Sequence, residues 1–418
     1  MAFVMGRIPK QLQLIVEQGM FSGTGFLVNI ALVKLLSLEQ YGLFASLVIV
    51  VYLLLAVVQS LVVQPLQVHV GTESRDADYR SVLLVVLLPL VVLFAAAPLV
   101  LYAIGPEWID EYRSLLPVFA AYAATFLLSD FLRKYFLARG QTEIVVGMTG
   151  TYLLGVAAGL AYGAYTGLTD LISYLLLLAA AFLPGLLLGG LLYLRRCRLP
   201  PLDFLRRYLR IHLVEGQWLL YAAVVQWLSS NLYVMTSGLL IGVEALGVLR
   251  FVQTLLGVIN IVLQTLENYV LPRLSEAYRA SVEQYYRSAQ RQLGLYQVAM
   301  LAGLGVLFVF AREVIVLVGD AAFAPYAYVL RGMVLLYVVI IAAYPIRLLI
   351  RVTELNRSYF TAYLASFLFS LVSYRYLLGT FGVSGAVAGL IINQLILQAT
   401  WLVVLQKKQF KLWKLYTW

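Results

Sequence analysis

The chain consists of long apolar runs separated by short polar segments. The runs from Gly42 to Leu66 and from Ser81 to Ile104 lack the alternation of apolar and polar positions that membrane barrel strands show. A helix needs about twenty apolar residues to cross the core of a bilayer. By that measure the pattern predicts twelve membrane-spanning helices, at residues 13–36, 42–66, 81–104, 114–137, 144–166, 171–194, 216–240, 245–271, 292–318, 328–350, 358–378 and 384–405.

The composition supports this membrane assignment. Of the 418 residues, 62% are hydrophobic and 12% are charged, whereas soluble domains have roughly 45–50% apolar and about 25% charged residues. A soluble fold of this length cannot bury so much apolar surface. Helix bundles and closed barrels are the structures that satisfy their backbone hydrogen bonds in lipid. The sequence therefore predicts an all-α integral membrane protein.

An internal repeat divides the chain into two like halves. Residues Leu38–Phe44 return as Val243–Leu249, and further correspondences follow in the same order: Pro65 and Pro272, Gly105 and Gly319, Tyr112 and Tyr326, Leu116 and Leu330, Arg133 and Arg347. We expect an N-terminal six-helix bundle at 1–194, a cytoplasmic basic amphipathic linker at 195–215, and a C-terminal six-helix bundle with a cytoplasmic tail at 216–418. Two like halves inside a membrane are typical of transporters.

The basic residues predict the orientation of the helices. With the N-terminus inside, 24 of the 30 lysines and arginines lie on the cytoplasmic side, and the exceptions are Lys34, Arg113, Arg250, Arg312, Arg331 and Arg375. This bias follows the positive-inside rule and places both termini in the cytoplasm. The net charge of +10 is therefore explained by topology and indicates no nucleic-acid partner.

The basic linker has the pattern of an amphipathic helix. Between Leu202 and His212, one side of a helical wheel is apolar and the other is charged; the apolar side carries Phe204, Leu205, Tyr208, Leu209 and Ile211. Such a helix is expected to lie on an anionic leaflet, where it would tether the two bundles.

Reactive and metal-binding side chains are scarce. The single cysteine, Cys197, excludes a disulfide framework, and the two histidines, His69 and His212, fall in separate polar linkers. The sequence therefore indicates no metal site and no cofactor. The short outer loops carry no cluster of His, Asp and Glu, so a membrane enzyme such as a glycan polymerase or ligase is disfavoured.

Two segments carry a family resemblance. Residues 17–29 (EQGMFSGTGFLVN) lead into residues 34–44 (KLLSLEQYGLF), and residues 131–140 read FLRKYFLARG. Together, residues 17–29 and 34–44 resemble the first helix and turn of the polysaccharide-exporter, O-antigen-flippase-like branch of the multidrug/oligosaccharidyl-lipid/polysaccharide (MOP) flippase superfamily. Residues 131–140 look like the exit of that family's fourth helix, and Lys34 stands where family members commonly carry arginine or lysine.

The resemblance implies two six-helix bundles related by a parallel repeat about the membrane normal. Helices 1, 2, 7 and 8 would line a central cavity that opens alternately to each side. Members of the superfamily carry lipid-linked oligosaccharides, lipid-linked peptidoglycan precursor or cationic drugs. The drug antiporters rely on acidic residues in the cavity helices, and here Glu17 and Glu267 lie only near the expected inner ends of such helices.

Two basic residues are candidates for binding a diphosphate. Lys34 and Arg250 lie near the outer ends of predicted helices 1 and 8. A lysine or arginine at mid-bilayer costs about 2.5–3.5 kcal/mol on insertion scales, so its presence within a span needs a reason. Substrate binding is one interpretation, and snorkelling of the side chain to the headgroups is the other.

Amides on the same predicted cavity helices are candidates for binding sugar hydroxyls, because each amide offers donors and an acceptor. The alternative for any one of them is hydrogen bonding between helices. The substrate-binding hypothesis includes Asn29, Gln226, Asn231, Gln253, Asn260 and Gln264.

Asp130, Arg133 and Lys134 fall at i, i+3 and i+4 on predicted helix 4. We interpret them as a structural ion pair near the inner leaflet, and a proton-coupling role for Asp130 is the alternative.

The sequence thus favours a multi-pass protein of the cytoplasmic membrane that is not an enzyme. It is expected to translocate a lipid-linked oligosaccharide or related envelope glycolipid by alternating access. Membrane lipids and the lipid-linked saccharide would be its partners, with an envelope glycan polymerase or glycosyltransferases acting beside it. The alternative is a cation-coupled multidrug antiporter of the same superfamily.

Overall fold

The computed structural model describes residues 10–69 and 76–416. Within those ranges the chain is almost entirely helical and has no strand, as expected. It divides into two compact units. The N-terminal unit comprises the residues up to Gln40 together with Leu47–Val224, and the C-terminal unit comprises Tyr41–Ser46 together with the residues from Val225 onward.

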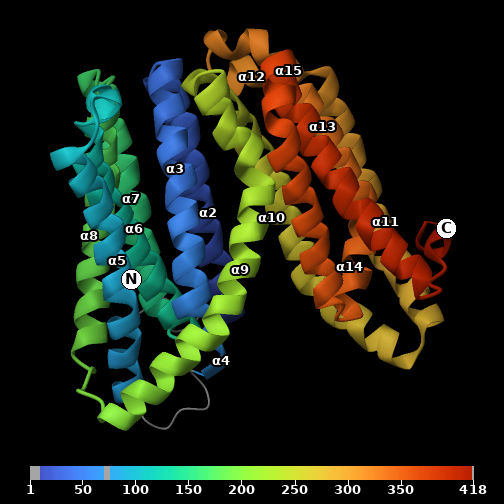
Figure 1. Cartoon of the computed structure of the whole chain (residues 1–418), viewed down its shortest axis with the longest axis horizontal. Coiled ribbons are helices and arrows are strands. Elements are labelled where there is room, and N and C mark those ends of the chain that lie inside the picture. The colour runs from blue at the N-terminus through green and yellow to red at the C-terminus, as the bar shows by residue number, and fades with distance from the viewer. Residues whose placement is uncertain (1–9, 70–75, 417–418) are drawn as a thin grey trace. The chain divides into compact units, whose positions relative to one another are not determined.

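The N-terminal unit contains long helices that run side by side (Figure 1). Its elements are α2 (Lys10–Leu35), α3 (Leu38–Val58), the π-helical turn η1 (Gln59–Val63), α4 (Gln64–His69), α5 (Asp76–Ile104), η2 (Glu107–Tyr112), α6 (Leu115–Ala138), α7 (Thr142–Thr166) and α8 (Leu171–Leu194). Helix α7 packs against α2 and α8, and α6 packs against α5 and α8.

The boundary between the two units falls inside helix α9 (Leu202–Leu240), between Val224 and Val225, so α9 contributes to both units. The other elements of the C-terminal unit are α10 (Val243–Ala280), α11 (Val282–Val309), α12 (Ala311–Val318), η3 (Ala321–Tyr326), α13 (Ala327–Ala342), α14 (Tyr344–Val352), α15 (Asn356–Lys407) and η4 (Leu412–Leu415). Helix α15 packs against α13 and α14, and α11 packs against α10 and α13. Within α15, Gly382 has a φ of 56° and breaks the helical backbone, so α15 contains the two last predicted spans.

All twelve predicted spans fall on helices, but fewer than twelve helices of the structure qualify as candidate membrane spans. Among the described residues, nine helices are long and apolar enough to cross a membrane. Two of the predicted spans coincide with one of these, the segment Arg357–Lys407. The predicted spans at 13–36 and 216–240 are helical, in α2 and α9, but fall short of that criterion because polar residues interrupt them.

The apolar core of the N-terminal unit includes the linker. Phe204, Leu205, Tyr208, Leu209 and Ile211 pack against a cluster of buried residues from α3, α5 and α6, and Tyr208 is 4% exposed. This apolar side therefore packs against protein, with Tyr208 buried and the other four residues half-buried. Contact of this helix with an anionic leaflet stays a prediction. The first turns of α9 are an integral part of the N-terminal unit.

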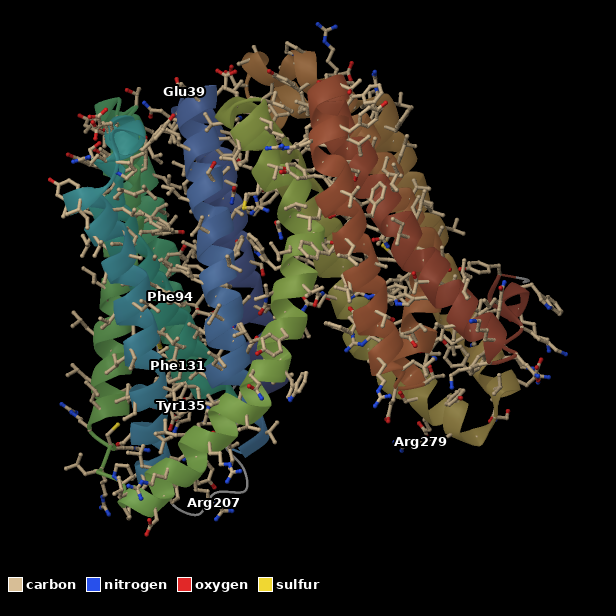
Figure 2. All side chains as sticks on the ribbon, in the orientation of Figure 1. Glu39, Phe94, Phe131, Tyr135, Arg207 and Arg279 are labelled. Atoms are coloured by element: carbon tan, nitrogen blue, oxygen red, sulfur yellow. The ribbon has the colours of Figure 1, made fainter. Side chains whose placement is uncertain are left out.

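The labelled side chains indicate the two ends of that unit. Figure 2 shows Phe131 and Tyr135 within it, and Glu39 and Arg207 at opposite ends. Phe131 and Tyr135 are each 1% exposed and form part of a group of edge-on aromatic contacts with Tyr193.

Candidate functional site

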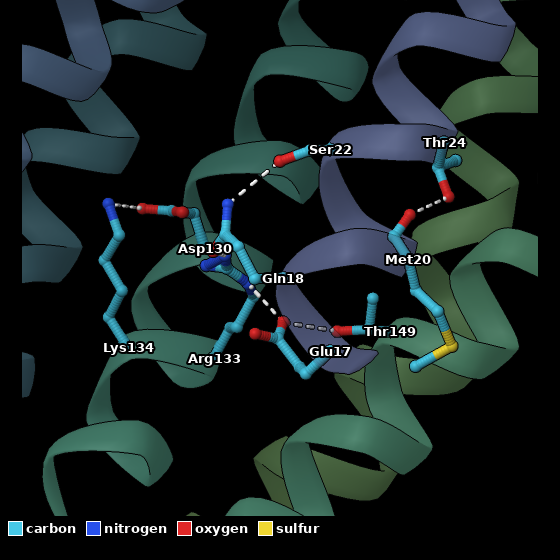
Figure 3. Close-up of polar contacts among 9 residues, drawn as sticks. All are labelled: Glu17, Gln18, Met20, Ser22, Thr24, Asp130, Arg133, Lys134 and Thr149. Carbon is cyan, nitrogen blue, oxygen red and sulfur yellow. Dashed lines mark hydrogen bonds and ion pairs between the residues drawn. The ribbon is translucent and has the colours of Figure 1, made fainter. Parts of the chain in front are cut away.

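The N-terminal unit buries an ion pair between α2 and α6 (Figure 3). Arg133 Nε donates a hydrogen bond to Glu17 Oε1 at 2.9 Å, and Thr149 Oγ1 from α7 donates to the same oxygen at 3.0 Å. Glu17 is 2% exposed and Arg133 is 7% exposed. The guanidinium carbon of Arg133 also lies 3.8 Å from the centre of the Phe21 ring. This carboxylate is therefore neutralised by a partner from another helix.

A second buried carboxylate lies one turn before Arg133 on α6. Lys134 Nζ is 3.1 Å from Asp130 Oδ2, as the i,i+4 spacing predicts, and Figure 3 shows this pair. Gln59 Nε2 donates to the same oxygen at 2.8 Å. The hypothesis that Asp130 and Lys134 form an ion pair is thus confirmed, whereas Arg133, also assigned to it, pairs with Glu17 instead.

Gln59 begins the π-helical turn of the second predicted span. Such turns are rare and often occur at functional sites. The carbonyl of Leu61 in this turn is 2.8 Å from His212 Nδ1, and the opposite ring nitrogen, Nε2, is 3.1 Å from the Tyr79 hydroxyl. A carbonyl oxygen only accepts, so Nδ1 carries the proton. His212 is fully buried and joins α9 to η1 and α5.

The C-terminal unit holds a third buried carboxylate, Glu267 of α10, which is 8% exposed. Arg351 Nη1 of α14 forms an ion pair with Glu267 Oε1. Arg347 Nη2, one turn earlier on α14, lies 3.9 Å from Glu267 Oε2. The Tyr344 hydroxyl donates to the Leu263 carbonyl at 2.8 Å and is 3.2 Å from Glu267 Oε2.

These residues line a cavity of about 450 Å³ between α10, α13, α14 and α15. Its polar lining combines one carboxylate, two guanidinium groups, four amides and two phenols. The lining residues are Asn260, Leu263, Gln264, Glu267, Ile340, Tyr344, Arg347, Arg351, Tyr363, Gln394, Leu397, Gln398 and Trp401. The formal charge of the lining is one positive, from two arginines and one glutamate. A cavity of this size is within the range of about 300–1,000 Å³ that small-molecule sites occupy.

Three of the predicted amides contribute to this cavity. Asn260 and Gln264 line it, and Asn260 Nδ2 donates to the Tyr337 hydroxyl at 2.7 Å. Gln226 forms a hydrogen bond with Tyr363, which also lines the cavity. The i,i+4 spacing of Asn260 and Gln264 thus places both at the same site.

The two predicted basic residues lie elsewhere. Lys34 is exposed in the last turn of α2, in the N-terminal unit. Arg250 is half-buried on α10 in the C-terminal unit, and its Nη1 donates to Gln253 Oε1 at 3.1 Å. The charge of Arg250 also acts on the hydroxyl of Tyr41. Arg250 and Gln253 are therefore brought together, and neither lines the cavity.

The remaining two amides bond within their own helices. Asn29 Nδ2 donates to the Gly25 carbonyl at 2.8 Å, and Asn231 Nδ2 donates to the Trp227 carbonyl at 2.9 Å.

Sequence reasoning misses most of the cavity. The charge pattern places Arg347 and Arg351 among the cytoplasmic residues, and it gives Gln394, Gln398 and Trp401 no role. One signal is present, since Gln394 and Gln398 are an i,i+4 pair of amides inside an apolar run.

The fold, though not the sequence, matches known proteins. No protein-family model and no curated protein sequence matches the chain. An inward-facing structure of a multidrug resistance MATE family transporter of the MOP superfamily matches with a TM-score of 0.71 at 13% identity, over 96% of this chain and 98% of that chain. A MATE transporter from Vibrio cholerae matches with a TM-score of 0.61 at 17% identity, over 95% of each chain.

A third solved structure has the same fold and a different binding pocket. A MOP superfamily transporter from Pyrococcus furiosus, for which a binding pocket of reverse polarity suggests a different function, matches with a TM-score of 0.59 at 14% identity, over 96% of each chain. The fold of this chain is therefore that of the multi-pass MATE transporters of the MOP superfamily.

Proposed function

We propose that this protein is a flippase that translocates a lipid-linked oligosaccharide, or a related envelope glycolipid, across the cytoplasmic membrane by alternating access. The MATE transporter fold supports transport as the class of function. The choice of cargo rests on how charge is distributed among the helices.

The observation that carries the proposal is the pairing of the buried carboxylates. Three carboxylates are buried among the residues that the structure describes: Glu17, Asp130 and Glu267. Each has a basic partner from Arg133, Lys134 or the α14 arginines. Unpairing a buried charge costs several kcal/mol, so these groups are poorly suited to attract a cationic drug.

Positive charge is available for an anionic cargo. The C-terminal cavity has two arginines for one carboxylate, and Arg250 is half-buried in the same unit. A lipid-linked saccharide carries its negative charge on a diphosphate, and guanidinium groups bind phosphates through charge-assisted hydrogen bonds. In this proposal Lys34 and Arg250 each contact the diphosphate at some stage of translocation, and the amides on α2, α9 and α10 contact the sugar.

A cation-coupled multidrug antiporter is the second candidate. The multidrug resistance function of the matching MATE transporter favours it, whereas the pairing of Glu17, Asp130 and Glu267 opposes it. A coupling role for Asp130 belongs to this second candidate.

Deletion of the gene in its native host tests the proposal. The flippase function predicts that the lipid-linked saccharide accumulates in the membrane, which mass spectrometry of extracted lipids measures, while sensitivity to ethidium stays unchanged. A strain that becomes more sensitive to ethidium, with no change in lipid-linked saccharides, contradicts the proposal and supports the antiporter.

A further inference from the structure

Three buried polar atoms around the C-terminal cavity have no hydrogen-bond partner among the described residues. They are Arg347 Nε, Gln398 Oε1 and Trp401 Nε1, and all three residues line the cavity. More than about nine in ten buried polar groups in proteins are hydrogen-bonded, because an unsatisfied one costs about 1–3 kcal/mol. Three such atoms around one hollow indicate that a ligand supplies the missing partners.

Two of the three residues are deeply buried. Trp401 is 1% exposed and Gln398 is 6% exposed. The Trp401 ring stacks on Tyr359, with ring centres 5.6 Å apart and planes at 17°. This stacking occupies one indole face and fixes the plane of the ring, so the N–H edge of Trp401 is its polar contact for a ligand.

The identities of the three atoms define the chemistry of the ligand. Arg347 Nε and Trp401 Nε1 each carry a hydrogen and only donate, whereas Gln398 Oε1 only accepts. The ligand must therefore offer at least two acceptors and one donor. A phosphate group with attached sugar hydroxyls offers both. A neutral sugar lacks the negative charge that a guanidinium group binds, and inorganic phosphate lacks the sugar hydroxyls.

The charge of the cavity selects an anion. Arg351 is held by its ion pair with Glu267. Arg347 Nη2 is 3.9 Å from the same carboxylate, at the limit of an ion pair, and its Nε is unsatisfied. The guanidinium of Arg347 is thus available to a phosphate, while a cationic ligand would face two arginines against one glutamate.

We propose that this cavity binds the phosphosugar headgroup of the cargo, with Arg347 and Trp401 donating to phosphate oxygens and Gln398 accepting from a sugar hydroxyl. The proposal rests on the proposed function and deepens it, since it assigns a headgroup site to α10, α13, α14 and α15 of the C-terminal unit. The expected amides Asn260 and Gln264 line the cavity, but Lys34 and Arg250 do not, so the cations of this site differ from those expected from the sequence.

Equilibrium titration of the purified full-length protein tests this site with three probes: glucose 1-phosphate, glucose and inorganic phosphate. We expect glucose 1-phosphate to bind about tenfold or more tightly than glucose, which lacks the charge-assisted hydrogen bond to Arg347. We expect it to bind about threefold to tenfold more tightly than inorganic phosphate, which lacks the hydroxyl that donates to Gln398. Equal affinity for glucose 1-phosphate and phosphate would reduce the site to an anion site and overturn the proposal, as would the absence of any binding.

Two conservative variants locate the binding. Trp401→Phe removes the N–H and keeps a ring to stack on Tyr359, and Arg347→Gln removes the charge. We expect Trp401→Phe to weaken glucose 1-phosphate binding about threefold to tenfold and Arg347→Gln to weaken it about tenfold or more. The matched controls are Trp413→Phe, at a 62% exposed residue, and Arg331→Gln, whose Nε donates to the Phe308 carbonyl. Binding that is equal in all four variants contradicts the assignment.

The binding experiment and the gene deletion test the two proposals separately. If deletion causes lipid-linked saccharide to accumulate but glucose 1-phosphate does not bind, this cavity is not the headgroup site and the flippase proposal stands. If the probe binds as expected but deletion changes no lipid-linked saccharide, the binding site stands and the flippase proposal fails.

Discussion

Gly42 and Gly247 lie against each other in the C-terminal unit, where a Cβ atom on Gly247 would be 2.9 Å from the Cα of Gly42. A Cβ on Gly42 would in turn overlap the carbonyl oxygen of Val243. Both glycines belong to the motif that the two halves of the sequence share. Small residues let helix backbones approach closely, so this contact gives a physical reason for a glycine at both positions.

Substitution of Gly247 by alanine should destabilise the protein by about 1–3 kcal/mol, because the added methyl group meets backbone that cannot move aside. A Cβ atom on Gly257, which belongs to the same helix, would have no atom within 4 Å, so Gly257→Ala is the matched control. Thermal unfolding of the two purified variants measures the difference. Equal melting temperatures would contradict the prediction, because they would show that the backbones at Gly42 and Gly247 can move apart without loss of stability.

The buried pair of Glu17 and Arg133 predicts a strong coupling. Glu17→Ala leaves the guanidinium of Arg133 buried without its carboxylate and should cost about 3–5 kcal/mol. The double variant Glu17→Ala/Arg133→Ala should cost less than the two single variants together. A double-mutant cycle of unfolding free energies measures this coupling, and strict additivity would contradict the observed ion pair.

His212 predicts a structural role for the first turns of α9. His212→Phe keeps an aromatic ring but removes the hydrogen bonds to the Leu61 carbonyl and the Tyr79 hydroxyl. The expected loss is about 1–3 kcal/mol, measured as a lower thermal midpoint. Arg207→Ala, at the end of the N-terminal unit shown in Figure 2, is the control on the same helix. A variant at His212 as stable as this control would contradict the role.

Asp130 can be tested as a coupling group. Because Asp130 is held by Lys134 and Gln59, we expect Asp130→Asn to retain transport, with the same dependence on an imposed pH gradient. Transport of the lipid-linked saccharide into or out of vesicles, measured with and without the gradient, checks this. Loss of the gradient dependence alone would assign proton coupling to Asp130.

The two basic residues expected from the sequence give a further prediction. Lys34→Ala and Arg250→Ala should each lower export of the lipid-linked saccharide while the protein still inserts into the membrane, because the diphosphate loses a cation. Export is measured in the native host alongside the amount of protein in the membrane. Unchanged export in both variants would remove these residues from the site.

Much of the fold could be predicted from the sequence, because hydropathy and length alone place a helix. The predicted span 171–194 coincides with α8 (Leu171–Leu194), and 114–137 differs from α6 (Leu115–Ala138) by one residue at each end. The surroundings of helix α9 are harder to predict, because the apolar side of its amphipathic start packs against protein. A helical wheel shows that a side is apolar but not what covers it.

The buried ion pairs, including the one that lines the cavity, could not be predicted from local spacing because they join residues distant in sequence. Glu267 pairs with arginines about eighty residues later, and Arg133 pairs with Glu17 rather than with its neighbour Asp130. The local i,i+4 spacing correctly indicates the Asp130–Lys134 pair. The charge pattern counts Arg347 and Arg351 among the cytoplasmic residues and does not indicate that both line a polar cavity.

Reconstitution into liposomes tests the nature of the cargo most directly. The measurement compares the translocation of a fluorescent disaccharide linked through diphosphate to a polyprenyl lipid with the transport of ethidium by the same vesicles. We expect the protein to translocate the lipid-linked disaccharide and not to transport ethidium. Transport of ethidium driven by a cation gradient, with no movement of the lipid, would contradict it.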